Sequence, residues 1–156
     1  MAIVAVAAAG LATTACSGGP TALELDPRKP EGIAAFRRLL DVHRASIGCP
    51  ALDWHVELAG VAESHSADMA SRDFFGHVNP EGESPFDRMR RAGLAWSGPA
   101  GENIAASDQD PAVVFDGFLA SPTHRQNIER CEYTHHGLGL VEGRWTHLFL
   151  ANPAGR

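Results

Sequence analysis

The end of the chain differs in hydrophobic pattern from everything before it, and this difference constrains the fold most. Two β-prone runs, Thr134 to Val141 and Trp145 to Ala151, are joined by Glu142-Gly143, a pair typical of tight hairpin turns. The segments before them show helical spacing of apolar residues instead of strand alternation. Helices followed by a small sheet indicate an α+β protein, with the helices packed on a mainly antiparallel sheet.

An amphipathic helix is predicted from Glu31 to Ile47. Its apolar residues recur at helical spacing, and its charged residues lie on the other side of the helix. Gly48 and Pro50 then end the helix. The apolar set is Ile33, Phe36, Leu39, Leu40 and Val42, and the charged set is Arg37, Arg38, Asp41 and Arg44.

Four further helices are expected from capping signals. Asp53 is expected to cap a second amphipathic helix that carries apolar residues as far as Met69. A short polar residue followed by Pro starts each of the others, because the polar side chain caps the helix and Pro fits its first turn. These pairs are Ser84-Pro85, Asp110-Pro111 and Ser121-Pro122.

The N-terminus predicts export and an extracytoplasmic location. Met1 to Ala15 is an uncharged apolar run that is too short for a membrane anchor, as in a signal peptide. The small residues before Cys16 resemble the cleavage box of bacterial lipoproteins, so Cys16 is expected to carry lipid. Secretion without lipid and a cytosolic buried thiol remain alternatives, because Thr13 replaces the usual Leu and a basic n-region is missing. Residues 16–30 are predicted to be a flexible spacer before a domain that covers residues 31–156.

Two cysteines remain once Cys16 is assigned to lipid. Cys49 and Cys131 form an even pair in an oxidising compartment, where a disulfide is the simple outcome. A catalytic thiol is the alternative, although neither cysteine lies in a recognisable nucleophile motif.

Composition and missing motifs exclude several functional classes. The formal net charge of −6, without a cluster of Lys and Arg, argues against nucleic-acid binding. The chain has no His-Glu-x-x-His helix, no Gly-x-Ser-x-Gly elbow and no phosphate loop. Gly137-Leu138-Gly139 lacks the third Gly of a dinucleotide-binding loop, so it is expected to serve close backbone packing instead.

Three short strings carry the polar residues best suited to chemistry. The first places a His on a turn-rich loop, the second places a Glu next to a Gly, and the third places a His in the first turn of a helix. The strings are FFGHVNPEG with His77, GENIA with Glu102 and SPTHRQNI with His124.

The order and spacing of these strings resemble the CAP superfamily of cysteine-rich secretory, antigen 5 and pathogenesis-related 1 proteins, in its bacterial secreted branch. The resemblance covers about Ile33 to Asn152. It implies an α-β-α sandwich with a central antiparallel sheet and a surface cleft formed by His77, Glu102 and His124. A second Glu found in other members corresponds to Ser121 here, at the rim of the cleft. An aromatic neighbour, usually Trp, corresponds to Phe118.

The three cleft residues are compatible with several roles. Two neutral imidazoles and a carboxylate are suitable ligands for zinc or another divalent metal, and they leave a position open for water. Without a metal the same groups could act as a general acid and base. His124 is expected to stay neutral, because a helix N-terminus disfavours a cation. Glu102 could instead be structural, and His65 could either edge the cleft or lie on a hydrogen-bonded helix face.

Three functions therefore stay open. The leading hypothesis is an exported binding module, tethered through Cys16, that holds a metal or a small-molecule, lipid or cell-wall ligand. The second is a metal-dependent, peptidase-like hydrolase with Glu102 as the base. The third is a structural or interaction protein. The absence of a nucleophile motif favours a protein without catalytic turnover.

Surface or sheet-face positions are predicted for other histidines and for a basic cluster. Neighbouring residues of a strand face opposite sides, so one of His135 and His136 is expected to be exposed. The basic cluster lies on a short helix and is expected to be solvated. The cluster is Arg88, Arg90 and Arg91, and the other histidines are His43, His55 and His147.

Overall fold

A computed structural model describes residues 28–154, and these residues form five helices and four strands. The predicted signal peptide, the lipidation of Cys16 and most of the predicted spacer lie outside the described residues. The elements are α1 (Arg28–Ser46), β1 (Asp53–Trp54), α2 (Val56–Ser71), α3 (Pro85–Arg91), β2 (Ala100–Ala106), α4 (Pro111–Ala120), α5 (Pro122–Glu129), β3 (His135–Val141) and β4 (Arg144–Leu150).

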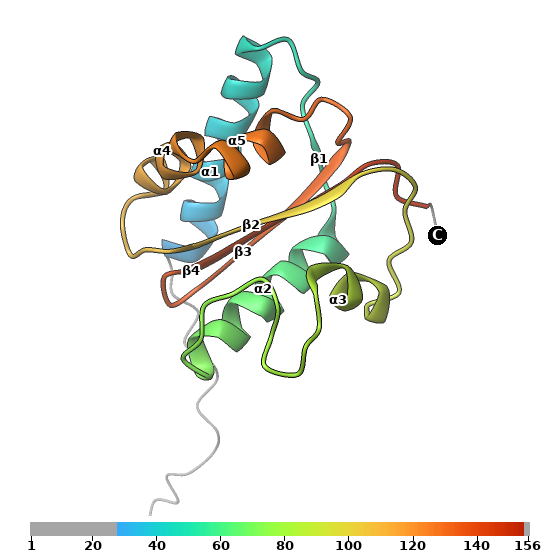
Figure 1. The fold of residues 1–156 in the computed structure, drawn as a ribbon. Coiled ribbons are helices and arrows are strands. Elements are labelled where there is room, and N and C mark those ends of the chain that lie inside the picture. The colour runs from blue at the N-terminus through green and yellow to red at the C-terminus, as the bar shows by residue number, and fades with distance from the viewer. Residues whose placement is uncertain (1–27, 155–156) are drawn as a thin grey trace, which may run out of the picture.

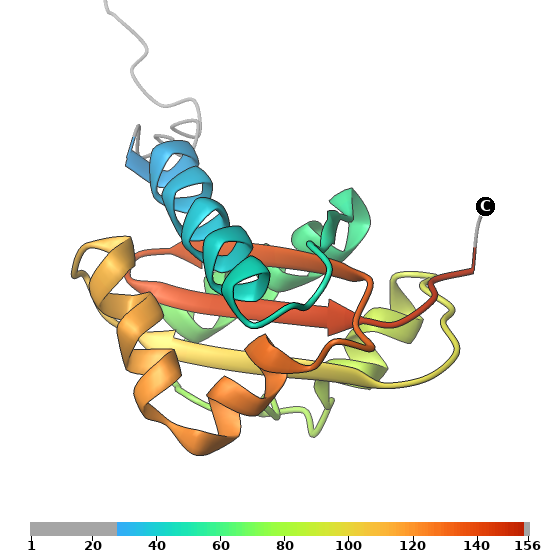
Figure 2. The same ribbon diagram turned by 90° about the horizontal axis from the view of Figure 1, so that it is seen from above.

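The sheet is the middle of three layers. Helices α1, α4 and α5 cover one face, and α2 and α3 cover the other (Figures 1 and 2). The strand order is β1-β3-β4-β2, in which β4 runs antiparallel to both neighbours and the two-residue β1 is parallel to β3. This arrangement confirms the predicted α+β class and the α-β-α sandwich with a mainly antiparallel sheet.

Local signals set several element boundaries. Ser84 and Asp87 form a reciprocal capping box at the start of α3, and the Asp110 side chain accepts a hydrogen bond from the Ala112 nitrogen at 2.8 Å. The β3–β4 hairpin turns through Glu142 and Gly143, which both have positive φ. Two consecutive positive φ angles are those of a type I′ turn, whose twist matches the flanking strands.

Two strands and two caps differ from the prediction. The Ser121 side chain makes no capping hydrogen bond at the start of α5. The side chain of His55, not of Asp53, caps α2 by accepting from the Leu58 nitrogen, and Asp53 lies in β1. Strand β2 has no alternating pattern because residues 101–104 are all buried. A strand that is covered on both faces shows no alternation of apolar and polar residues. Gly and Asn, which are uncommon in strands, weaken the sequence signal of β2 further.

The predicted assignment of α1 residues to an apolar and a charged face is wrong at two positions. Val42, assigned to the apolar face, is 71% exposed, whereas Arg44 is fully buried. The Arg44 guanidinium donates to the backbone carbonyls of Pro50 and Ile128, both at 2.8 Å, and to that of Arg130 at 3.1 Å. Arg44 therefore joins the end of α1 to the loop after it and to the end of α5.

The predicted disulfide is confirmed in the same region. Cys49 follows α1 and Cys131 follows α5, and the bond between them closes a separation of 82 residues. Arg44 and this disulfide connect the same two segments. None of the helices in residues 28–154 combines the length and apolarity needed to cross a membrane.

The glycines of β3 allow α2 to lie directly against the sheet, which confirms their predicted packing role. A Cβ atom at Gly137 would lie closer than 3.0 Å to the backbone of Leu58 and Ala59. A Cβ at Gly139 would overlap the backbone of Ala62 and Glu63 in the same way. Any side chain at either position would push α2 away from β3.

Gly139→Ala is expected to lower the free energy of unfolding by about 3 kcal/mol, because backbone atoms cannot yield to the added methyl group as a side chain could. Urea unfolding followed by far-UV circular dichroism measures this loss. Gly60→Ala is the control: Gly60 is exposed on α2 with nothing near its Cβ position, and this change should stabilise the helix by about 0.5–1 kcal/mol. An unchanged Gly139→Ala midpoint would contradict the packing argument.

Candidate functional site

The three residues of the predicted site come from two layers of the fold and from the strand between them. Glu102 lies on β2, which is an edge strand of the sheet. His77 lies on the loop between α2 and α3, in one layer, and His124 lies in the first turn of α5, in the other. The three residues are therefore distributed around the β2 edge of the sheet, with one imidazole on each side of it.

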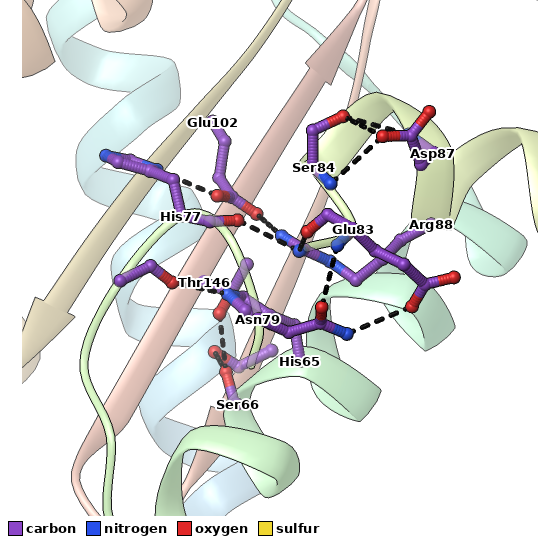
Figure 3. A network of polar contacts seen from close by, with 12 residues as sticks. His65, Ser66, His77, Asn79, Glu83, Ser84, Asp87, Arg88, Glu102 and Thr146 are labelled. Carbon is purple, nitrogen blue, oxygen red and sulfur yellow. Dashed lines mark hydrogen bonds and ion pairs between the residues drawn. The ribbon is translucent and has the colours of Figure 1, made fainter. Parts of the chain in front are cut away.

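His77 and Glu102 are in direct contact (Figure 3). The Nδ1 atom of His77 lies 2.8 Å from Oε1 of Glu102, and the carboxylate is buried while the His77 side chain is 49% exposed. A carboxylate only accepts, so Nδ1 of His77 donates this bond. In the neutral ring the lone pair then belongs to Nε2, which is available to a ligand.

The second oxygen of Glu102 is occupied by Arg88, a residue that the sequence prediction placed on a solvated face. Arg88 is 5% exposed, and its Nη2 atom lies 2.8 Å from Oε2 of Glu102. Its Nη1 atom donates to the carbonyls of His77 at 2.9 Å and Glu83 at 3.0 Å. Arg88 thus neutralises the buried carboxylate and fixes the backbone of the His77 loop (Figure 3).

A sequence signal for Arg88 exists, although it is weak. Arg88 lies between Pro85 and Met89, which are both buried against the rest of the domain. In a helix of seven residues this spacing puts Arg88 near the inward face. Arg90 and Arg91 are exposed, as predicted.

His65 supports the loop that carries His77. It is buried on α2, and its Nε2 atom lies 2.9 Å from the carbonyl of Gly76, the residue before His77. Burial lowers the pKa of His65, and the nearby charge of Arg88 lowers it further, whereas Glu102 raises it. The hydrogen-bonded helix face predicted for His65 is confirmed, and His65 and Arg88 also line a cavity of about 510 Å³.

His124 packs against the aromatic residue identified from the sequence. The rings of His124 and Phe118 lie 5.1 Å apart in an edge-on arrangement. Burial lowers the pKa of His124, and the charge of His77 lowers it further. Both effects favour the neutral form of the His124 imidazole. Ser121 joins α4 to α5, and its side chain makes no capping hydrogen bond.

Direct metal coordination by all three residues stays a prediction. Within residues 28–154, no group of three His, Cys, Asp or Glu side chains has an arrangement that could hold a metal ion. Both oxygens of Glu102 are engaged by His77 and Arg88. The donor chemistry of two imidazoles suits zinc, and the Glu102 carboxylate contacts the His77 ring at Nδ1.

The fold defines the class of protein. The structure matches an extracellular protein containing an SCP domain from Bacillus anthracis with a TM-score of 0.79 and 29% identity, over 87% of this chain and 45% of that one. It also matches a cysteine-rich secretory protein from Staphylococcus aureus (TM-score 0.71, 14% identity, 81% and 40% of the two chains). An outer surface protein of Borrelia burgdorferi shares the fold (TM-score 0.69, 16% identity, 78% and 93%).

The chain belongs to the CAP, or cysteine-rich secretory protein, family, whose model matches residues 37–149. It is 33% identical over 127 residues to the uncharacterized protein YkwD of Bacillus subtilis, over 78% of this chain and 49% of that protein. It is 34% identical over 112 residues to the uncharacterized membrane protein YlbC of the same organism, over 72% and 32%. The chain thus spans about half of YkwD and about a third of YlbC.

Proposed function

We propose that this CAP-domain protein is an exported binding module that holds a zinc-like divalent metal ion between His77 and His124. The observation that carries the proposal is the 2.8 Å contact from His77 Nδ1 to Glu102, which leaves Nε2 of a half-exposed ring for a ligand. A carboxylate behind a metal-binding imidazole fixes the tautomer and the ring orientation and raises the basicity of the ligand nitrogen. His124 supplies a second imidazole that burial keeps neutral.

Two imidazoles leave further coordination positions on the metal. Water or a small ligand would fill these positions at the β2 edge, so a small-molecule or cell-wall ligand is part of the same proposal. The alternative of a hydrolase with Glu102 as base is less favoured, because His77 and Arg88 already occupy both carboxylate oxygens. A base needs a free oxygen within reach of the attacking water.

Isothermal titration with zinc tests the metal site. His77→Ala and His124→Ala are each expected to weaken zinc binding at least about 10-fold, and Glu102→Gln about 10-fold, since outer partners of metal ligands contribute 10–100-fold. His43→Ala is the matched control and should bind like wild type, because the His43 imidazole lies on α1 and pairs with Glu129 at the last residue of α5. Equal heats of zinc binding in wild type and all variants would show that His77 and His124 do not bind the metal.

Export and membrane tethering complete the proposal. The neighbour from Bacillus anthracis is described as extracellular, and the Cys49–Cys131 disulfide requires an oxidising compartment. Lipid on Cys16 would anchor the domain to the membrane. Mass spectrometry of the N-terminal peptide from a membrane fraction should find a diacylglyceryl group on Cys16 as the first residue. An unmodified Cys16, or a mature chain that starts elsewhere, would contradict tethering.

A further inference from the structure

The two imidazoles of the proposed site belong to different layers, so their separation depends on how β2 is joined to α5. Successive residues of a strand point to opposite faces of the sheet. Glu102 accordingly contacts His77 on the α2 and α3 side, whereas Asn103 points to the α5 side and reaches His124. Strand β2 therefore contacts both imidazole-bearing segments through two adjacent residues.

Asn103 and Asn127 make crossed contacts between these elements. Nδ2 of Asn103, on β2, donates to the backbone carbonyl of His124 on α5 at 2.9 Å. Nδ2 of Asn127, on α5, donates back to the backbone carbonyl of Glu102 at 3.2 Å and to Oδ1 of Asn103 at 2.8 Å. Each asparagine thus holds the main chain of the site residue on the other element.

The remaining atoms of this pair are also satisfied. The hydroxyl of Tyr133, a fully buried residue, lies 3.3 Å from Oδ1 of Asn127, so hydrogen bonds run in one direction from Tyr133 through both asparagines to His124. A Cβ at Gly101 would collide with Tyr133 and Asn127, so Gly at this position allows α5 to approach β2 closely. Buried amides in a satisfied network of this kind specify one geometry.

We propose that Asn103 and Asn127 are positioning residues that set the separation of the His77 and His124 imidazoles by tying β2 to the first turn of α5. This inference deepens the proposed zinc site and rests on it for the identity of the ligand. Neither asparagine touches the metal, because their amides are used on backbone carbonyls and on each other. Their contribution comes from the ordering of the two imidazoles before the metal arrives.

Asn103→Asp is the first test variant, because it keeps the shape of the side chain but replaces the donor that faces the His124 carbonyl with an acceptor. It is expected to weaken zinc binding about 10-fold in titration calorimetry. In the metal-free protein, the nuclear Overhauser effect between the His124 and Phe118 rings should fall at least about twofold, because these rings lie in contact only while α5 keeps its position.

Asn127→Ala is the second variant, at a half-buried position that tolerates truncation if Asn103→Asp does not fold. It removes both return contacts and should give the same two effects. The Asn103→Asp/Asn127→Ala double variant should lose no more zinc affinity than the stronger of the two single variants, because the pair acts as a unit.

Ser66→Ala is the matched control. It removes buried hydrogen bonds to Thr146 and Gly139 on the opposite side of the sheet, so it tests whether the loss of any buried polar contact gives the same effects. It should keep wild-type zinc affinity and the ring contact. Equal losses in Ser66→Ala, or a folded asparagine variant that keeps both readouts, would overturn the inference. If wild type gives no zinc heat, the proposed metal function fails, and the ring contact alone decides whether the asparagines position His124.

Discussion

Lowering the pH from 7 to 4.5 is expected to remove at least about 2.5 kcal/mol of unfolding free energy through the buried His136, and its buried partner His147 adds to the loss. Nδ1 of His136 on β3 lies 3.0 Å from Nε2 of His147 on β4, and both side chains are buried under α1. One neutral ring donates this bond and the other accepts it. The predicted sheet-face position of His147 is thereby confirmed, and of the neighbouring pair it is His136 that is buried while His135 is partly exposed.

Burial lowers the pKa of His136 to about 3, and the charges of Arg37 and Arg44 add to the effect. Burial also lowers the pKa of His147 well below its ordinary value, and a charge on His136 would lower it further. An unfolded chain takes up these protons near pH 6.5, whereas the folded chain resists them. Stability is therefore unaffected above about pH 6.5 and falls as the pH drops toward 3, and His136 alone contributes about 2.5 kcal/mol of the loss at pH 4.5.

Urea unfolding of wild type and His147→Gln at pH 7 and 4.5 measures this loss. The His147→Gln variant keeps a hydrogen-bonding group beside His136 but takes up no proton at this position, so its pH-dependent loss should be smaller than that of wild type. His135→Gln should behave like wild type, because His135 is partly exposed on β3 next to His136. A His147→Gln protein with the full acid loss would show that other groups cause it.

Arg44→Met is expected to lower the free energy of unfolding by about 5 kcal/mol, a large share of the total for a domain of this size. The substitution fills the same space but leaves the carbonyls of Pro50, Ile128 and Arg130 without their donors. Hydrogen bonds from a charged donor contribute about 1.5–3 kcal/mol each, and buried carbonyls that lose their partners add a desolvation cost. The energy of burying the guanidinium, which also lowers the pKa of Arg44, offsets part of this sum.

Equilibrium unfolding in urea at pH 7 checks the loss. Arg44→Lys should recover only a small part of the loss. A lysine ammonium is compact and cannot reach the three carbonyls to which the planar guanidinium donates. Arg38→Met is the control on the same helix: Arg38 is exposed, and its loss should stay within about 0.5 kcal/mol. If Arg44→Met unfolds within about 1 kcal/mol of wild type, the buried guanidinium does not stabilise the joint between α1 and α5.

Much of the fold was predictable because its signals are local. The starts of α3 and α4 follow from Ser84-Pro85 and Asp110-Pro111, whose caps act within one helical turn. The β3–β4 hairpin follows from two residues that accept positive φ. By contrast, β2 became a strand through its pairing with β4 and its burial on both faces, which no short window of sequence contains.

The candidate site divides in the same way. The strings around His77, Glu102 and His124 pointed to these residues, and the structure brings His77 and Glu102 into contact. The pairing of Arg88 with Glu102 could not be inferred from the sequence, because Glu102 lies 14 residues away on another element. The crossed asparagines were equally hidden, since their acceptors are backbone carbonyls.

The sequence by itself determined the α+β class, the cysteine pair and the capped starts of α3 and α4, and it indicated three candidate site residues. These features depend on spacing, turn chemistry and side-chain type, which are properties of short segments. Only the tertiary structure decided which charged and polar side chains are buried. Arg44, Arg88 and His136 owe their burial to partners from distant segments, and the free energy of a buried polar group depends on whether those partners are in place.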